Sequence, residues 1–320
     1  MITLKDVQNA KERIAPYIIR TPLLRVPALD DYLNCQVYLK PENLQYTGSF
    51  KLRGATNRML VLSDEEKQNG VVCASSGNHA QGVACAAKRL GIKATIVMSK
   101  NCNPVKLENV KQFGADVVMV GNSSTEREEK SKEISQAEKR TEIHPFADDY
   151  IKAGQGTIAL EILDDEPNMD KIVVPIGGGG LISGIAVAAK GIKPDITIIG
   201  AEPQSANRYS ESLKVGKPVK VENVNTIADG TRTERANLGN LEIIKKYVDI
   251  LTTVEDEEIR KAMKLIVEKA KIVAEPSSSL GVAAISKNSL DIKSDDKVCF
   301  VISGGNNDLK LLSEILANKI

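Results

Sequence analysis

Short runs of β-branched and other apolar residues alternate with helix-patterned segments along most of this chain. The runs are mostly apolar on both faces, as in strands buried within a parallel sheet. This alternation predicts an α/β fold of doubly wound, mainly parallel sheets, with ligand sites at the carboxyl ends of the strands. The expected strands are residues 71–74, 94–98, 116–120, 171–176, 196–201 and 297–302, and the expected helices include 79–90, 104–113 and 255–271.

The chain length of 320 residues fits about two domains. Three closely spaced strand–helix units begin at residue 71, and they predict one small domain over residues 69–146. We expect residues 1–68 and 147–320 to form a larger domain, which is therefore discontinuous in sequence.

Composition excludes several classes of protein. The 43 basic and 42 acidic residues nearly balance, which argues against a nucleic-acid partner. No apolar run approaches the roughly 20 residues that span a membrane, and the charged N-terminus is not a secretory signal. The five cysteines lack CxxC spacing and are typical of reduced thiols in a cytoplasmic protein. Two histidines are too few for a histidine-rich metal centre.

A strand, four consecutive glycines and a helix follow one another in residues 172–190. Gly177–Gly180 offer backbone N–H groups at a helix start, which favours a phosphate site, although a flexible loop is the simpler alternative. Glu202 lies about 20 residues further on, as a dinucleotide-binding motif requires. However, Ser183 stands where that motif needs a glycine, so a single phosphate is favoured over a pyrophosphate.

Two further polar turns follow expected strands. Residues 75–79, Ser-Ser-Gly-Asn-His, gather hydroxyl, amide and backbone donors at a helix start, which suits a carboxylate. The alternative is an ordinary helix N-cap, and for this turn alone the cap is favoured. Residues 303–306, Ser-Gly-Gly-Asn, are expected to lead into a helix in the same way. Three such turns suggest that several loops converge on one ligand.

Lys51 begins another expected helix, in TGSFKLRGA (47–55). A cation is unfavourable beside the positive end of a helix, so Lys51 differs from an ordinary surface lysine.

Four motifs in this order resemble the serine/threonine dehydratase and serine racemase family: TGSFKLRGA, SSGNHAQG (75–82), GGGGL (177–181) and SGGN (303–306). Members are pyridoxal-phosphate-dependent enzymes of the tryptophan-synthase-β-like fold, fold type II. The likeness covers essentially the whole chain, including AGQGTIALEIL (153–163), TIADG (226–230) and EPSSSLGVAA (275–284).

The resemblance implies specific roles at matching positions. Lys51 would form the Schiff base with the cofactor aldehyde and then act as a general base. The other cofactor-binding positions would be Phe50, Asn78, Gly177, Gly178, Gly179, Gly180, Leu181 and Ser303, and the substrate-binding positions Ser75, Ser76, Asn78 and His79. Ser303 would face the pyridine nitrogen.

We expect an L-serine/L-threonine dehydratase acting on a small amino-acid substrate, in a homodimer or homotetramer. Serine racemase, 3-hydroxyaspartate dehydratase and a β-replacement enzyme such as cysteine synthase are alternatives within the fold. A dinucleotide-binding α/β protein is the alternative from another class. Racemisation requires a second acid/base, for which Ser76 is the candidate; otherwise the Ser76 hydroxyl contacts backbone.

Glu202 and the Ala206 carbonyl match part of the site that holds Mg²⁺ or Ca²⁺ in family racemases. Arg208 stands where that site has a further carboxylate, and a guanidinium cannot ligate a cation. A relocated ligand or a monovalent cation remains open. Phe146 replaces an asparagine of animal racemases. Arg127 matches an arginine near the substrate, although its charged surroundings favour a solvated helix face.

Overall fold

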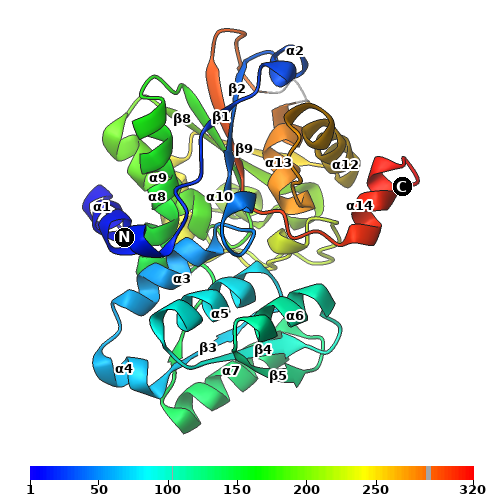
Figure 1. Ribbon diagram of the computed structural model, residues 1–320. Coiled ribbons are helices and arrows are strands. Elements are labelled where there is room, and N and C mark those ends of the chain that lie inside the picture. The colour runs from blue at the N-terminus through cyan, green and yellow to red at the C-terminus, as the bar shows by residue number, and fades with distance from the viewer. Residues whose placement is uncertain (103, 286–289) are drawn as a thin grey trace.

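Two lobes, each built on its own sheet, make up the computed structural model, which describes residues 1–102, 104–285 and 290–320 (Figure 1). All six predicted strands are confirmed, with ends that differ by at most two residues. The strands are β1 (Leu24–Arg25), β2 (Gln36–Pro41), β3 (Val71–Ala74), β4 (Ala94–Ser99), β5 (Asp116–Val120), β6 (Thr141–Glu142), β7 (Lys171–Pro175), β8 (Thr197–Pro203), β9 (Ile250–Val254) and β10 (Lys297–Ile302).

Helices cover both sheets. In chain order they are α1 (Leu4–Ile14), α2 (Asp30–Leu33), α3 (Lys51–Leu60), α4 (Asp64–Asn69), α5 (Asn78–Leu90), α6 (Pro104–Gln112), α7 (Ser124–Glu138), α8 (Asp149–Asp165), α9 (Gly180–Ile192), α10 (Arg208–Val215), α11 (Leu238–Tyr247), α12 (Asp256–Leu265), α13 (Pro276–Ile285) and α14 (Leu309–Leu316). The helix predicted over 255–271 is α12 followed by a π-helical turn, Ile266–Ala270.

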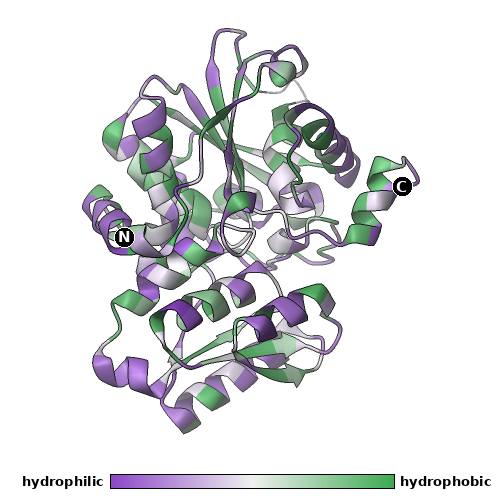
Figure 2. Cartoon of the chain, viewed as in Figure 1, coloured by the Kyte–Doolittle hydropathy of each residue, from purple (hydrophilic) through white to green (hydrophobic). Residues whose placement is uncertain are grey.

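The large sheet has the strand order β1-β2-β10-β7-β8-β9, and every pair except β1–β2 is parallel. Ile172 and Val174 of β7 pack with α8, α9 and α11, whereas Val173 packs with α12 and α13 on the opposite face. Strands that are apolar on both faces therefore lie between two helical layers, as the sequence pattern predicts. Figure 2 shows these apolar strands inside and hydrophilic helix faces outside.

The small sheet has the order β5-β4-β3-β6 and is wholly parallel. α3, α5 and α6 cover one face, while Ile134 of α7 packs on Val72 and Val97 at the other. All four strands lie within residues 69–146, and the six strands of the large sheet lie outside that range. The two doubly wound, mainly parallel sheets of the expected fold are thereby confirmed; the domain boundaries stay a prediction.

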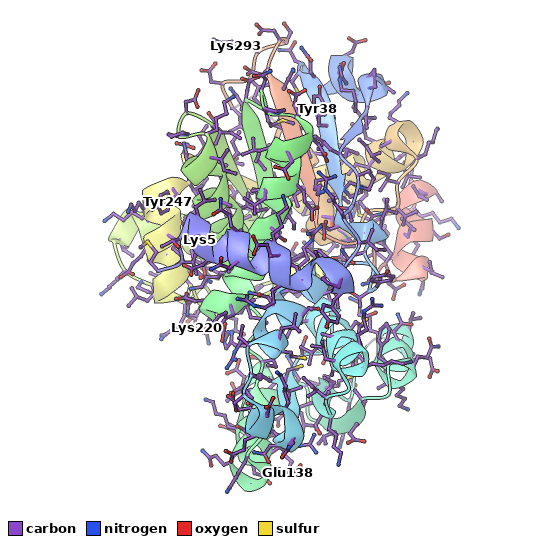
Figure 3. All side chains as sticks on the ribbon, turned by 60° about the vertical axis from the view of Figure 1, so that its left-hand side comes forward. Lys5, Tyr38, Glu138, Lys220, Tyr247 and Lys293 are labelled. Carbon is purple, nitrogen blue, oxygen red and sulfur yellow. The ribbon has the colours of Figure 1, made fainter. Side chains whose placement is uncertain are left out.

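Helix α8 lies between α3, which begins at Lys51, and α9, which begins at the last of the four glycines. A Cβ atom on Gly154 would lie 2.7 Å from the Gly54 Cα of α3, so these backbones touch. A Cβ atom on Gly156 would lie 2.6 Å from the Gly184 carbonyl of α9. Glycine at these positions lets α3 and α9 pack directly against α8. Figure 3 shows α1 lying across the outer side of this group, where it contacts α8 and α9.

The third turn leads into a helix, as expected, after a short connection. No helix begins at Asn306; α14 begins at Leu309, because Asp308 is its N-cap and accepts the N–H groups of Lys310 and Leu311. The Asn306 side chain instead donates to the Thr47 carbonyl at 2.9 Å. Among the described helices, none has both the length and the apolar character needed to cross a membrane.

Candidate active site

A cavity of about 480 Å³ lies between the two lobes, at the carboxyl ends of β3, β7 and β10. Its volume is in the range of small-molecule sites. The structure brings all the expected cofactor- and substrate-binding residues into its lining: Phe50, Lys51, Ser75, Ser76, Asn78, His79, Gly177, Gly178, Gly179, Gly180, Leu181 and Ser303. Residues from both lobes therefore surround one ligand space, as the three turns suggest.

Lys51 is the first residue of α3, and its side chain is partly buried in the cavity wall. Its Nζ donates to the Pro145 carbonyl at 2.8 Å and lies 5.1 Å from the centre of the Phe50 ring. Burial lowers the pKa of the Lys51 amine to about 8, although the Glu275 carboxylate acts in the opposite direction. The neutral, nucleophilic amine is therefore far more abundant near pH 8 than for a solvated lysine.

The four glycines form a narrow strand-to-helix turn. A Cβ atom on Gly178 would lie 2.1 Å from the Phe146 ring, and Gly179 has a left-handed φ of 84°. Gly179 is also the N-cap of α9, and no side chain caps that helix. The first N–H groups of α9 thus remain for an anion in the cavity, as expected for a phosphate cradle.

The turn at residues 75–79 leads into α5 in a similar way. Its N-cap is Gly77, and no side chain accepts the first-turn N–H groups, so the ordinary cap favoured for this turn alone is wrong. Ser75 Oγ accepts the Gly77 N–H at 3.3 Å, and Ser76 Oγ accepts the Ser99 N–H at 2.8 Å. The Ser76 hydroxyl thus contacts backbone while also lining the cavity, and it retains its own proton for donation.

His79 is the last residue of this turn and is 3% exposed. Its Nε2 lies 2.8 Å from the Ile143 carbonyl, which can only accept, so Nε2 carries the proton. Burial, followed by the nearby Lys51 charge, lowers the His79 pKa to about 3. A neutral His79 adds no positive charge for a substrate carboxylate, so the N–H groups of α5 are the better donors.

Glu275 is a cavity residue to which the sequence analysis assigns no role. It is 2% exposed and accepts from Asn78 Nδ2 at 2.6 Å, while Asn78 Oδ1 accepts from Asn306 at 2.8 Å. Burial, followed by the neighbouring Asp229 charge, raises the Glu275 pKa to about 7. The only sequence signal was its position at the start of EPSSSLGVAA, one of the segments that carry the resemblance.

Ser303 follows β10, the neighbour of β7 in the sheet, and is 4% exposed. Its Oγ lies 3.0 Å from Ser278 Oγ. Ser278 also donates to the Gly304 carbonyl at 2.6 Å. The Ser303 side chain thus places a hydroxyl and not a carboxylate at this point of the cavity, and its proton can be donated either to Ser278 or to a ligand.

Two cationic side chains approach the cavity from the small lobe, the part of the structure built on the four-stranded sheet β5-β4-β3-β6. Arg127 of α7 is half-buried, lines the cavity and donates to the Asn122 carbonyl at 3.1 Å, so it lies near the ligand space as the resemblance implies. The start of α7 lies at the cavity rim, and this proximity is not visible in the local charge pattern. Lys106 of α6 pairs with Asp229 of the large lobe at 2.7 Å and thereby links the lobes beside the cavity.

The expected metal ligands lie outside the cavity lining. Glu202 is fully buried and accepts the N–H groups of Tyr209 and Ser210 at 3.1 and 2.9 Å. It therefore cannot contact a ribose, as the dinucleotide alternative requires. Arg208 donates to the Ala206 carbonyl, and its Nη2 lies 3.7 Å from Glu202. Among the described residues, no three acidic, histidine or cysteine side chains are grouped as a metal site.

Comparisons with known proteins agree with this geometry. Residues 14–304 match the family model described as pyridoxal-phosphate-dependent enzyme. The chain is 43% identical to an L-threonine ammonia-lyase of Thermotoga maritima, over 99% of this chain and 78% of that protein. It is 41% identical to a catabolic L-threonine dehydratase of Staphylococcus aureus, over 99% of this chain and 92% of the relative. The solved structure of maize serine racemase superimposes with a TM-score of 0.94 at 39% identity, covering 99% of this chain and 97% of that one. The chain belongs to the family of pyridoxal-phosphate-dependent enzymes.

Proposed function

We propose that the protein is a pyridoxal-phosphate-dependent ammonia-lyase that converts L-threonine and L-serine to 2-oxo acids and ammonia. One observation carries the proposal. A single cavity contains the low-pKa amine of Lys51, the uncapped start of α9 and the uncapped start of α5. These supply a nucleophile, a phosphate cradle and a carboxylate cradle. The relatives that are named as L-threonine ammonia-lyase and L-threonine dehydratase support the choice of reaction.

The residues present fit pyridoxal phosphate. Gly178 could not carry a side chain without striking Phe146, and the α9 N–H groups beside it have no side-chain cap. These groups would hold the phosphate, Lys51 would attach the aldehyde, and Ser303 would receive the ring nitrogen. When bound, the cofactor supplies an aldehyde and a conjugated ring that accepts the electron pair released at the substrate α-carbon.

Lys51 performs the proton transfers in this proposal. Because burial lowers the pKa of the Lys51 amine to about 8, the amine is neutral in far more molecules near neutral pH than an ordinary lysine is. The free amine takes the proton from the substrate α-carbon, and its ammonium returns a proton to the departing β-hydroxyl, which leaves as water. The released enamine hydrolyses to the 2-oxo acid and ammonia.

Neighbouring groups orient the substrate. The N–H groups of α5 and the Ser75 hydroxyl bind its carboxylate, so that the α-proton points toward Lys51. Ser303 offers a hydroxyl to the ring nitrogen. A neutral hydroxyl cannot stabilise a full positive charge on that nitrogen as a carboxylate would. Such a weak electron sink is compatible with prompt loss of the β-hydroxyl and less so with transamination.

A substrate panel tests the proposal. Purified holoenzyme is incubated with L-threonine, L-serine and 3-hydroxyaspartate without any thiol, and both 2-oxo acid and ammonia are measured. We expect equal amounts of the two products from L-threonine and L-serine, and none with Lys51→Ala. Oxo acid that appears only from 3-hydroxyaspartate would assign the alternative dehydratase, and product formation only with an added thiol would assign a β-replacement enzyme.

Serine racemase is a second candidate, supported by the Ser76 hydroxyl in the cavity wall. Ser76 comes from the small lobe and Lys51 from α3, so the two groups can approach a planar substrate from different elements. The same incubations are analysed for D-serine by chiral chromatography. D-serine formed at a rate comparable with that of pyruvate would support the racemase.

We also propose a homodimer or homotetramer in the cytoplasm. Support for the compartment comes from the five cysteines, all free and all but Cys102 buried. Sedimentation of purified protein tests the assembly, and fractionation of cells tests the location.

A further inference from the structure

The Arg208 guanidinium lies directly behind the glycine turn. Its side chain is fully buried at the start of α10. Nη2 donates to the carbonyls of Ile176 and Gly177 at 2.9 and 2.6 Å, and Nε donates to Gly177 at 3.1 Å. Nη1 donates to the Ala206 carbonyl. All three guanidinium nitrogens are thus bonded to backbone carbonyls, two of which belong to the turn and the residue before it.

These bonds determine which way the turn presents its N–H groups. In a trans peptide the C=O and the following N–H point in opposite directions. With the Ile176 and Gly177 carbonyls held toward Arg208, the N–H groups of Gly177 and Gly178 point away from it. The next carbonyl, that of Gly178, is held in the same manner by Tyr209 Oη and Asn240 Nδ2, each at 2.7 Å. The donors expected to bind phosphate are therefore oriented from behind by fixed side chains.

Carbonyl and carboxylate oxygens surround the Arg208 guanidinium, as they would surround a bound metal cation. Glu202 is 3.7 Å from Nη2, and its oxygens also accept from the Tyr209 and Ser210 N–H groups and the Ser210 hydroxyl. Glu202 and the Ala206 carbonyl are the two expected metal ligands, yet both already face the guanidinium. A divalent cation between them would adjoin a buried like charge, which is strongly unfavourable. The residues present do not fit a divalent metal.

We propose that Arg208 is the built-in cation of this chain: it takes the place of a divalent metal ion and positions the glycine turn for phosphate binding. Cofactor affinity is then independent of Mg²⁺ and Ca²⁺. The inference rests on the proposed use of pyridoxal phosphate, but not on which amino acid is the substrate. Arg208 acts through the backbone of residues 176–178, so it is a positioning residue.

The first experiment uses the wild-type protein. Apoenzyme is treated with EDTA and titrated with pyridoxal phosphate in metal-free buffer, then with added Mg²⁺ or Ca²⁺, and the Kd and the melting temperature are measured. We expect the Kd values to agree within about twofold and the melting temperature to be unchanged. A Kd that tightens severalfold with either metal would overturn the inference.

Substitutions at Arg208 give the second test. Arg208→Asp places a carboxylate beside Glu202 and the Ala206 carbonyl, an oxygen set that Ca²⁺ or Mg²⁺ can bind. We expect its Kd for pyridoxal phosphate to weaken by about 10-fold or more in EDTA, because buried carbonyls lose their donors, and to recover largely with Ca²⁺ or Mg²⁺. Arg208→Met should show the same weakening with no recovery. Arg20→Met, at an exposed arginine, is the matched control and should change neither value.

The outcomes separate the two proposals. If the wild type binds no pyridoxal phosphate under any condition, the proposed function fails. If it binds but Arg208→Met retains its affinity within about twofold, only the role of Arg208 fails. If the variants do not fold, the wild-type titration alone decides, since it needs no substitution.

Discussion

Arg53 and Glu42 form a two-point ion pair in which neither side chain is exposed: Nε and Nη2 of Arg53 each donate to a different Glu42 oxygen at 2.8 Å. Arg53 also pairs with Glu161 of α8 at 2.6 Å, and Lys40 of β2 pairs with the same carboxylate at 2.6 Å. Two cations and two carboxylates thereby balance inside the protein. Arg53 lies two residues beyond Lys51 in α3, so these ion pairs hold the start of α3 against β2 and α8.

Arg53→Met should destabilise the protein strongly. The substitution leaves two buried carboxylates with only Lys40 as a cation, which costs about 3–5 kcal/mol of unfolding free energy. Denaturant unfolding of the apoenzyme measures the loss. The control is Arg20→Met, which removes an ion pair with Asp165 whose arginine is 49% exposed, and should cost at most about 1 kcal/mol. Equal losses of unfolding free energy in the two variants would show that Arg53 does not neutralise the buried carboxylates.

Lys51→Ala should abolish covalent attachment of pyridoxal phosphate. Holoenzyme is reduced with borohydride, digested and analysed by mass spectrometry, and we expect the cofactor mass on the peptide containing Lys51 and nowhere else. Lys88→Ala, at an amine that donates to the Gln112 carbonyl on the surface of the small lobe, is the control and should keep the label on Lys51. A label on another lysine of the wild type would refute the assignment.

Recombination of apoenzyme with pyridoxal phosphate should speed up as pH rises through about 8. Burial lowers the Lys51 pKa to about 8, so the amine loses its proton at a lower pH than an ordinary lysine does and becomes nucleophilic there. Stopped-flow absorbance between pH 6 and 10 measures the midpoint. Glu275→Gln should move the midpoint lower, since the Glu275 carboxylate raises the Lys51 pKa. A wild-type midpoint above about 9.5 would show that burial does not act on Lys51 as inferred.

Ser76→Ala should reduce any racemisation by about 100-fold or more, the usual contribution of a general acid or base, while largely sparing elimination. The ratio of D-serine to pyruvate formed from L-serine measures the effect. Ser75→Ala is the informative comparison, because its hydroxyl accepts the Gly77 N–H in the same turn but is not the proposed second base. Equal loss of both products in Ser76→Ala would rule out a two-base mechanism.

Gly178→Ala should weaken cofactor binding, because the new methyl group would lie within 2.1 Å of the Phe146 ring and displace the turn. Overpacking of this kind costs about 1–3 kcal/mol. Kd values for pyridoxal phosphate measure the effect. Adding Phe146→Leu to Gly178→Ala should restore part of the affinity, and no restoration would locate the damage elsewhere.

Both sheets and most of the site could be predicted because they depend on local patterns. β7 is apolar on both faces and ends at four glycines, and both signals lie within ten residues. β2 was not predicted because Lys40 and Gln36 interrupt its apolar pattern. Lys40 can be buried only because Glu161, 121 residues away, neutralises it. β9, ILTTV, was missed because its two threonines and partial exposure at the sheet edge obscure the pattern.

The role of Glu275, which the sequence does not indicate, arises from a contact between the two lobes. Glu275 acts through Asn78, 197 residues earlier in the chain, and neither sequence neighbourhood indicates the other. Arg127 faces the cavity because α7 packs beside β3 and β4, whereas its own neighbours are charged and exposed. Only the packing of the two sheets reveals such pairs.

The main-chain contacts of Gly154 and Gly156 fix how closely α3 and α9 can pack against α8. They set the spacing between the helix that carries Lys51 and the helix that begins at the glycine turn by backbone dimensions, which ordinary side-chain replacements do not alter. Helix α5, which follows residues 75–79, is held to α3 in a similar way, since a Cβ atom on Gly82 would lie 3.0 Å from the Lys51 carbonyl carbon. Substitutions of exposed side chains therefore leave the separation between the Lys51 amine and the glycine turn unchanged, because main-chain contacts set it.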